Sequence, residues 1–359
     1  MQTNGYLHHV HYFRGFAILN IVAIHAAAIA QWIPSYGYID TTTAFSAINE
    51  TLFHSATLYF SLISGLLFAA VLQSRGFGRF FRSKFFYVLV PYLVCSIVFT
   101  FQAWNIEGTG VIALQQDVGA YLDGLPRNLL LGEAQFTYWY IPVLLIILAF
   151  TPLLWTLVGH GGVRRHALWT VILAPLLVSR PEFIDGVSQV QPETLVYFLG
   201  AYAFGLHLGE RLDEHLDRLA EYRGLLIAVV VMASVAILVL QMNGVKHFGF
   251  YSVQESLWYL QKMGAAVLVL IWFRGLQPQR VHWLSPIADA AFSIYFLHAF
   301  YMVLVAELLY SFLMDEAFQP WSLYVMTVAY FVSSLALSFA TVFLFRTLFG
   351  SRSRLLIGN

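Results

Sequence analysis

The chain has 359 residues, of which 59% are apolar and only 11% are charged, and its mean hydropathy is +0.71. About a quarter of the residues in soluble domains are charged, so this chain has too few polar groups to cover a water-facing surface. Nineteen basic residues balance nineteen acidic ones, so no global charge points to nucleic acid. One cysteine, Cys95, excludes an internal disulfide and a cysteine-based zinc site. The composition predicts an all-α, polytopic membrane protein.

Ten apolar stretches are predicted to cross the bilayer as helices, because about 20 apolar residues span its hydrocarbon core. In chain order these are 12–32, 52–73, 84–104, 138–158, 166–179, 194–209, 223–241, 256–273, 288–312 and 321–348. The fifth and sixth are short and have polar edges, so their bounds are the least defined. No soluble linker separates the stretches, and the sequence shows no internal repeat. Residues 1–359 are predicted to form a single transmembrane domain.

The distribution of basic residues predicts the orientation of the chain. With a cytoplasmic N-terminus, the inner loops and ends hold fifteen of them: Arg14, Arg75, Arg79, Arg82, Lys84, Arg164, Arg165, Arg211, Arg218, Arg223, Arg274, Arg280, Arg346, Arg352 and Arg354. The outer loops hold three, Arg127, Arg180 and Lys246, and Lys262 lies inside a stretch. This asymmetry follows the positive-inside rule, and an even number of spans places both termini in the cytoplasm.

The start of the chain allows a second interpretation, as a cleaved secretory signal ending at Ala28-Ile29-Ala30. Asn20 and His25 interrupt its apolar run, which a cleaved signal would not need. We therefore expect the first stretch to be a retained span.

Ionisable residues inside spans are costly and mark candidate functional sites. Arg14 and His25 are eleven residues apart, close to three helical turns, so they share one face of the first helix and are separated by roughly 16 Å. Arg14 would lie at the inner interface and His25 near the middle of the membrane. The alternative is a topogenic arginine and a packed structural histidine.

A second candidate site is the basic cluster of Arg75, Arg79, Arg82 and Lys84, which would suit a phosphate-bearing ligand. Its alternative roles are topogenic charge and contact with anionic lipid. No Walker loop or dinucleotide glycine motif accompanies it, which argues against an ATPase.

The ninth stretch carries three ionisable residues. Asp289 and Glu307, five turns apart, are predicted to share a face of one helix, with His298 on the opposite side. His298 would lie at the depth of His25, either as a structural or as a catalytic residue. Lys262 and Glu307 both lie toward the outer side, where they could form an ion pair.

Aromatic residues gather at the outer edge of the fourth stretch, at Tyr138, Trp139 and Tyr140. Such residues are typical of an interfacial belt. The alternative function is a stacking platform for a sugar.

The chain resembles the acyltransferase-3 family of integral membrane O-acyltransferases over essentially its whole length. Five segments in order carry the resemblance: Tyr12-Phe13-Arg14-Gly15-Phe16-Ala17-Ile18 followed by His25, Tyr59-Phe60-Ser61-Leu62-Ile63-Ser64-Gly65, residues 80–92 with Lys84 and Pro91-Tyr92, Tyr138-Trp139-Tyr140-Ile141-Pro142-Val143, and Phe292-Ser293-Ile294-Tyr295-Phe296-Leu297-His298. Two segments depart from the family pattern. Tyr87 and Val88 stand where many members carry another arginine, and Ala56-Thr57-Leu58 lacks the usual proline.

The resemblance implies transfer of an acyl group, usually acetyl from acetyl-CoA, to a hydroxyl of a glycan, a lipid-linked sugar or another acceptor of the envelope or outside it. By this resemblance Arg14 and His25 are the essential pair. His25 would act as general base, or would itself be acylated and relay the group. Arg14 would hold the donor, with the basic cluster Arg75, Arg79, Arg82 and Lys84 nearby.

Further residues are candidates for acceptor binding: Tyr138, Trp139, Lys262, Tyr295, His298 and Glu307. Acyl-CoA is expected as a co-substrate, with no permanently bound cofactor and no metal, since the histidines are scattered. The expected location is a bacterial-type inner membrane, with the bilayer, acyl-CoA and a carbohydrate or other hydroxyl acceptor as partners. We expect the chain to lack the extracytoplasmic domain that is fused to some members.

A transporter or flippase of a glycolipid or small solute is the alternative function, because it would have the same composition and buried charges. It predicts an inverted repeat and paired broken helices, and the sequence shows no repeat. The acceptor, the acyl chain length and the oligomeric state are open.

Overall fold

The computed structural model describes residues 7–32, 44–103, 113–114, 118–159, 161–181, 188–247, 251–313 and 322–358. In these ranges the chain is helical apart from turns and one short antiparallel ladder, β1 (Gln102–Ala103) with β2 (Ala113–Leu114). The predicted all-α class is confirmed. The α-helices are α1 (His8–Trp32), α2 (Ala44–Phe53), α3 (Thr57–Leu67), α4 (Phe77–Lys84), α5 (Val90–Phe99), α6 (Val118–Leu131), α7 (Tyr140–Ala149), α8 (Thr151–Trp155), α9 (Val163–Leu173), α10 (Pro192–Glu210), α11 (Leu212–Glu221), α12 (Arg223–Met242), α13 (Val253–Gly275), α14 (Leu284–Asp289), α15 (Ala291–Leu313), α16 (Ser322–Phe349) and α17 (Ser353–Ile357).

Seven helical segments in the described ranges are long and apolar enough to cross a membrane: His8–Gln31, Ala44–Arg75, Phe77–Phe99, Arg223–Met242, Val253–Gly275, Ala291–Leu309 and Ser322–Ile357. They coincide with seven of the ten predicted stretches and make the chain an integral membrane protein. The stretch 138–158 is divided between α7 and α8, and 166–179 is an 11-residue helix followed by a 3₁₀ turn. The stretch 194–209 lies in the 19-residue α10. The count of ten spans stays a prediction.

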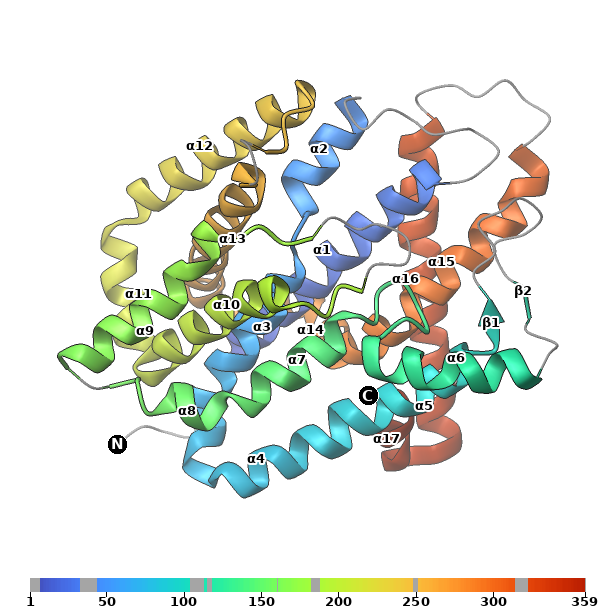
Figure 1. Cartoon of the computed structure of the whole chain (residues 1–359), viewed down its shortest axis with the longest axis horizontal. Coiled ribbons are helices and arrows are strands. Elements are labelled where there is room, and N and C mark those ends of the chain that lie inside the picture. The colour runs from blue at the N-terminus through green and yellow to red at the C-terminus, as the bar shows by residue number, and fades with distance from the viewer. Residues whose placement is uncertain are drawn as a thin grey trace.

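Helix α1 runs through the middle of the bundle and packs against α2, α3, α13, α14, α15 and α16 (Figure 1). Its apolar residues Phe13, Ala17 and Ile21 are fully buried. Helices α12 and α16 are peripheral and present apolar side chains such as Leu225 and Phe343 outward, as lipid-facing helices do. Side chains carried by α1 are therefore held on many sides at once.

Two helices approach so closely that only glycine fits between them. A Cβ atom at Gly65 of α3 would overlap the carbonyl oxygen of Tyr202, and one at Gly205 of α10 would overlap that of Leu62. The Ser61 hydroxyl donates a hydrogen bond across the same contact, at 2.8 Å to the Phe198 carbonyl oxygen. Small residues and interhelical hydrogen bonds are the usual means of helix association in membranes, where lipid tails remove the hydrophobic driving force.

Helix interruptions occur inside the bundle. The helical conformation is interrupted between α2 and α3, where Ser55 has a φ of 57°, and between α14 and α15 at Ala290. A π-helical segment, Phe85–Leu89, joins α4 to α5. Irregular backbone at membrane depth is tolerated where it is buried in protein or lines a cavity, and π-helical segments are frequent at functional sites. The polar groups beside these interruptions are therefore candidates for a functional site.

The α3–α10 contact leads to a test of stability. The substitution Gly65→Ala should force the two helices apart, lowering the free energy of unfolding by about 1–3 kcal/mol as overpacking does. Gly224→Ala is the matched control, because a Cβ there would meet no atom within 4 Å. Thermal unfolding in detergent measures both variants, and an unchanged transition for Gly65→Ala would contradict the close contact.

Candidate functional site

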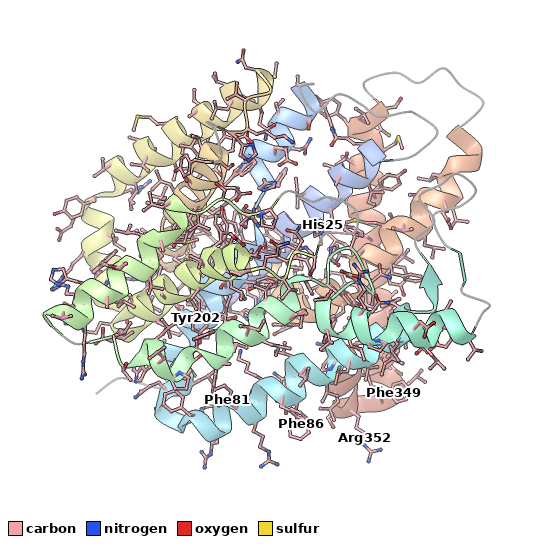
Figure 2. The ribbon with its side chains drawn as sticks, in the orientation of Figure 1. His25, Phe81, Phe86, Tyr202, Phe349 and Arg352 are labelled. Atoms are coloured by element: carbon pink, nitrogen blue, oxygen red, sulfur yellow. The ribbon has the colours of Figure 1, made fainter. Side chains whose placement is uncertain are left out.

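The two histidines predicted to lie at similar depth are in contact. His25 Nδ1 lies 2.9 Å from His298 Nε2, which joins α1 to α15. His298 is fully buried and His25 is half-buried, with the Phe136 ring edge-on to it at 5.3 Å between ring centroids. Figure 2 shows His25 inside the bundle.

The second hydrogen bond of His298 determines which ring nitrogens of the two histidines carry protons. Its Nδ1 lies 2.8 Å from the carbonyl oxygen of Ile294, and a carbonyl only accepts, so Nδ1 carries the proton. In the neutral pair, His298 Nε2 is then an acceptor, and His25 must donate from Nδ1. This leaves the lone pair on His25 Nε2, the nitrogen that can take a proton or attack an electrophile.

Arg14 lies three turns before His25 on the continuous helix α1, as predicted. One of its guanidinium nitrogens, Nη2, is 4.0 Å from Asp289 Oδ1, at the end of α14. Gly15 permits this approach, because a Cβ there would already lie 3.1 Å from the Leu284 carbonyl oxygen. The Arg-Gly pair of the first helix thus brings α1 against the segment that carries Asp289.

The prediction that Asp289 and Glu307 share a face of one continuous helix is wrong. Helix α14 ends at Asp289, Ala290 has φ −91° and ψ 4°, and α15 begins at Ala291. Ala290 has no sequence signal for a break, since neither it nor its direct neighbours is glycine or proline. The break turns Asp289 toward Arg14.

A cavity of about 410 Å³ opens beside Arg14. Among the residues that the structure describes, four cations and one carboxylate line it, together with hydroxyl and apolar side chains. The lining residues are Arg14, Phe60, Ile63, Ser64, Leu67, Ser83, Lys84, Tyr87, Val88, Leu144, Asp289, Phe292, Arg346, Arg354 and Gly358. Four positive groups against one negative group make it suited to an anion, and arginine is well matched to phosphate oxygens.

The basic cluster predicted from the sequence is divided by this cavity. Lys84 lines it, whereas Arg75, Arg79 and Arg82 are exposed on the neighbouring turn and on α4. Two cations missed by the sequence reasoning, Arg346 and Arg354, take part instead. Arg346 lies at the end of the last predicted stretch and Arg354 follows it, both more than 300 residues after Arg14, so no local pattern could link them to it.

The aromatic segment at the start of α7 is buried rather than interfacial. Tyr138 and Tyr140 are almost fully buried, and the Tyr138 hydroxyl donates to the Phe296 carbonyl oxygen at 2.6 Å. Trp139 packs edge-on against Phe198. Tyr295 donates to the carbonyl oxygen of Thr137, so α7 is bonded to α15 near His298. An exposed sugar platform at Tyr138 and Tyr140 does not fit this burial.

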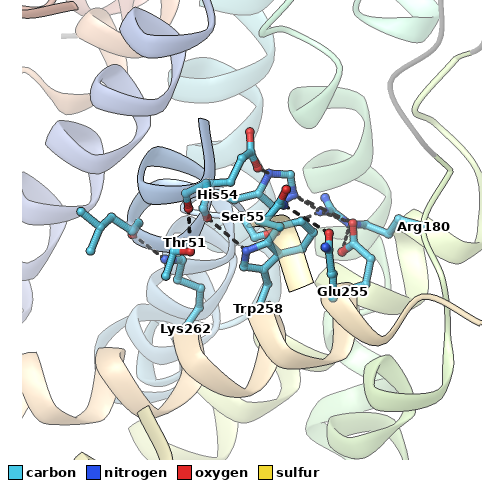
Figure 3. A network of polar contacts seen from close by, with 12 residues as sticks. Thr51, His54, Ser55, Arg180, Glu255, Trp258 and Lys262 are labelled. Carbon is cyan, nitrogen blue, oxygen red and sulfur yellow. Dashed lines mark hydrogen bonds and ion pairs between the residues drawn. The ribbon is translucent and has the colours of Figure 1, made fainter. Parts of the chain in front are cut away.

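Lys262 and Glu307 do not form the ion pair considered from the sequence. Lys262 is buried on α13, and its Nζ donates to the Leu52 carbonyl oxygen at 2.7 Å. Glu307 lies on α15, a helix outside this contact. Lys262 instead belongs to a polar network at the break between α2 and α3 (Figure 3).

Arg180 is the centre of that network. Its guanidinium donates to both carboxylate oxygens of Glu255, at 2.8 and 3.0 Å, and to the Ser55 hydroxyl at 2.9 Å. It also donates to His54 Nε2 at 3.3 Å, and His54 Nδ1 donates to Glu50 at 2.5 Å. Burial disfavours the charge, but the Glu255 carboxylate, together with Tyr197 and Glu50, outweighs it and raises the pKa of Arg180 above its usual value. The charges balance, so this network stabilises the helix break.

A family model described as an acyltransferase domain matches residues 7–345. The chain belongs to the acyltransferase-3 family. This match confirms the resemblance drawn from the five segments, and it gives the protein a membrane acyltransferase-type function. No curated protein and no solved structure matches the chain. In this member of the family, the essential pair implied by the resemblance lies beside the basic cavity at one end and the histidine contact at the other.

The Arg180 network provides a second test of stability. Glu255→Gln should lower the free energy of unfolding by about 3–5 kcal/mol, because it leaves a largely buried guanidinium without its counter-charge. Glu133→Gln is the matched control, since Glu133 pairs with the exposed Arg127 and should cost at most about 1 kcal/mol. Denaturant unfolding in detergent compares them; equal losses would show that the network does not hold the break.

Proposed function

We propose that the protein is a membrane O-acyltransferase that moves an acyl group, acetyl in the simplest case, from cytosolic acyl-CoA to a hydroxyl. The acceptor class is a glycan, a lipid-linked sugar or another molecule of the envelope or outside it. One observation carries the proposal: a single buried helix, α1, bears Arg14 in an anion-suited cavity and His25 with an open ring nitrogen. Donor and base would thus be held by the same rigid element.

The cavity fits the phosphate end of the donor. Coenzyme A carries a diphosphate and a phosphomonoester, the latter with a charge of about −1.5 to −2 near neutral pH. Arg14 and Lys84 lie in a wall that also contains the apolar side chains of Phe60 and Phe292. The cations would bind phosphate oxygens, while the apolar surface would pack against the pantetheine arm.

Helix α15 leads from the cavity to the histidine pair. Phe292 lines the cavity, and His298 follows less than two turns later. Between them, the buried hydroxyl of Ser293 has no hydrogen-bond partner in the described part of the chain. Buried hydroxyls without protein partners favour a polar ligand, and pantetheine amides offer the donors and acceptors that would satisfy them.

The chemistry follows from the proton order of the pair. The acceptor hydroxyl gives its proton to His25 Nε2 while its oxygen attacks the thioester carbon. The tetrahedral intermediate then expels the CoA sulfur, which takes the proton from His25 Nε2, and an ester is formed. His298 holds the His25 ring by accepting from Nδ1 and stabilises the positive charge that develops on it.

In the proposed function the chain lies in a bacterial-type inner membrane, and both of its termini lie on the cytoplasmic side. Support comes from the grouping of basic residues: Arg14, Lys84, Arg346 and Arg354, all predicted to lie on the inner side, meet in one cavity. In Figure 1, α4 and α17 lie along one edge, and the C-terminal end of α1 points away from it. An anionic donor from the cytosol would enter at the basic edge.

Transfer from acetyl-CoA is tested with purified protein in nanodiscs. We expect radiolabelled acetyl-CoA to release CoA, and His25→Ala and Arg14→Ala to lower the rate by at least about 100-fold, because a base or an orienting group is lost. His166→Ala and Arg165→Ala are matched controls, since both side chains are exposed outside the site. Full activity in His25→Ala would overturn the mechanism. Label retained covalently on wild-type protein without acceptor would indicate the acyl-histidine relay.

The role of His298 has its own test. His298→Ala should lower kcat by about 10–100-fold and leave the KM for acetyl-CoA unchanged, because the donor phosphates bind elsewhere. His298→Gln should recover part of the loss, since its side-chain carbonyl can accept the His25 Nδ1 proton. Rates are measured across pH, where the Ala variant should shift the acidic limb relative to wild type, because this limb reports the protonation of the base His25. Equal losses in both variants with a normal pH profile would assign His298 a packing role only.

A further inference from the structure

The segment after α16 is docked against the bundle although it lies beyond the family match, which ends at residue 345. Ser353 and Ile357 of α17 are buried, and the Cys95 thiol of α5 donates to the Leu356 carbonyl oxygen at 3.8 Å. Gly358 follows and packs on Phe292 and Phe296 of α15. Figure 1 shows α17 beside α5. The C-terminal turn thereby forms part of the cavity wall.

Two guanidinium groups reach the cavity from this segment and from the end of α16. Arg346 and Arg354 both line it, opposite Arg14 and Lys84. The guanidinium carbon of Arg354 lies 4.1 Å from the centre of the Tyr87 ring, which belongs to the π-helical segment. A cation held over an aromatic face keeps its hydrogen-bond donors free at its edge. Arg354 is therefore oriented without using the groups that would bind an anion.

Docking of α17 on the bundle does not explain why Arg354 lies at the same cavity as the other cations. The buried Ser353 and Ile357 attach the helix to the bundle, whereas Arg354 is largely exposed at the cavity rim. Arg352, two residues earlier, has the same charge but projects outward from the edge of the molecule (Figure 2). An arginine that only sets the membrane topology could point either into the cavity or outward. Bringing four cations around one space costs electrostatic repulsion, which an anionic ligand would relieve.

The order of groups along the donor decides which phosphate meets which cation. The thioester must reach His25, so the diphosphate follows the pantetheine arm and the ribose 3′-phosphate lies farthest from the reacting carbon. Arg14 is the deeper cation, with 29% of its side chain exposed, and Arg346 and Arg354 are the exposed ones at the rim. We propose that Arg354, with Arg346, binds the 3′-phosphate of coenzyme A and selects it against donors that lack this group.

This assignment rests on the proposed function and is tested by binding, which needs no acceptor. Affinities for CoA and for 3′-dephospho-CoA are measured with the full-length protein in nanodiscs. Wild type should bind CoA about tenfold or more tightly than 3′-dephospho-CoA, as expected for a charge-assisted hydrogen bond. Arg354→Ala should lose most of this preference for CoA, with its affinity for 3′-dephospho-CoA unchanged, because only Arg346 remains at the 3′-phosphate. Arg352→Ala is the matched control and should behave as wild type.

The possible outcomes separate the two proposals. If Arg354→Ala weakens both ligands equally, Arg354 acts only by stacking on Tyr87 to hold α17, and the phosphate assignment is overturned. Wild type that binds both ligands equally and transfers acetyl groups also overturns it, while the proposed function stands. Wild type that binds neither overturns the proposed function and this assignment together. Arg354→Lys covers a folding defect in the Ala variant, because it keeps the charge and should retain part of the preference for CoA.

Discussion

The structure depends on one constraint: polar groups on a helix inside a membrane must find partners in the protein, because no water is there to serve them. Helix α1 carries a charged group at one end of its polar face and an imidazole three turns later. The segment α14–α15 supplies a partner to each, Asp289 for Arg14 and His298 for His25. A continuous helix could not present both residues in this way, and the break at Ala290 allows it.

The polar network around Arg180 and the cavity beside Arg14 differ in their charge balance. The first has paired charges, as a structural network has, and the second has an excess of positive charge, as an anion-binding site has. Around Arg180 the cation meets Glu255 in a paired geometry, and the same guanidinium also donates to a hydroxyl and an imidazole. Such a network of paired charges rigidifies the chain. Around Arg14, in the described part of the chain, four cations face one carboxylate across a cavity. An excess of one charge around a cavity has no structural advantage, whereas it favours an incoming anion.

Much of this arrangement could be predicted from the sequence where the information is local. Long apolar runs indicated seven spans that the structure contains, and the eleven-residue spacing correctly placed Arg14 and His25 on one helix. The contributions of Arg346 and Arg354 could not be predicted, because the docking of α17 depends on packing against α5 and α15. The break at Ala290 likewise has no glycine or proline signal. Tertiary contacts, not helix propensity, determine both features.

The unbroken course of α1 gives the site a fixed length scale. Roughly 16 Å of helix separates the guanidinium-bearing turn from the imidazole-bearing turn, and an α-helix packed on most sides does not stretch. On the proposed function, the helix would fix the distance between the bound phosphates and the reacting nitrogen. A donor whose arm matches this interval would present its carbonyl carbon at His25 while its charged end is still held. A shorter or longer arm must give up one of the two contacts, so donor selection would come from length as well as charge.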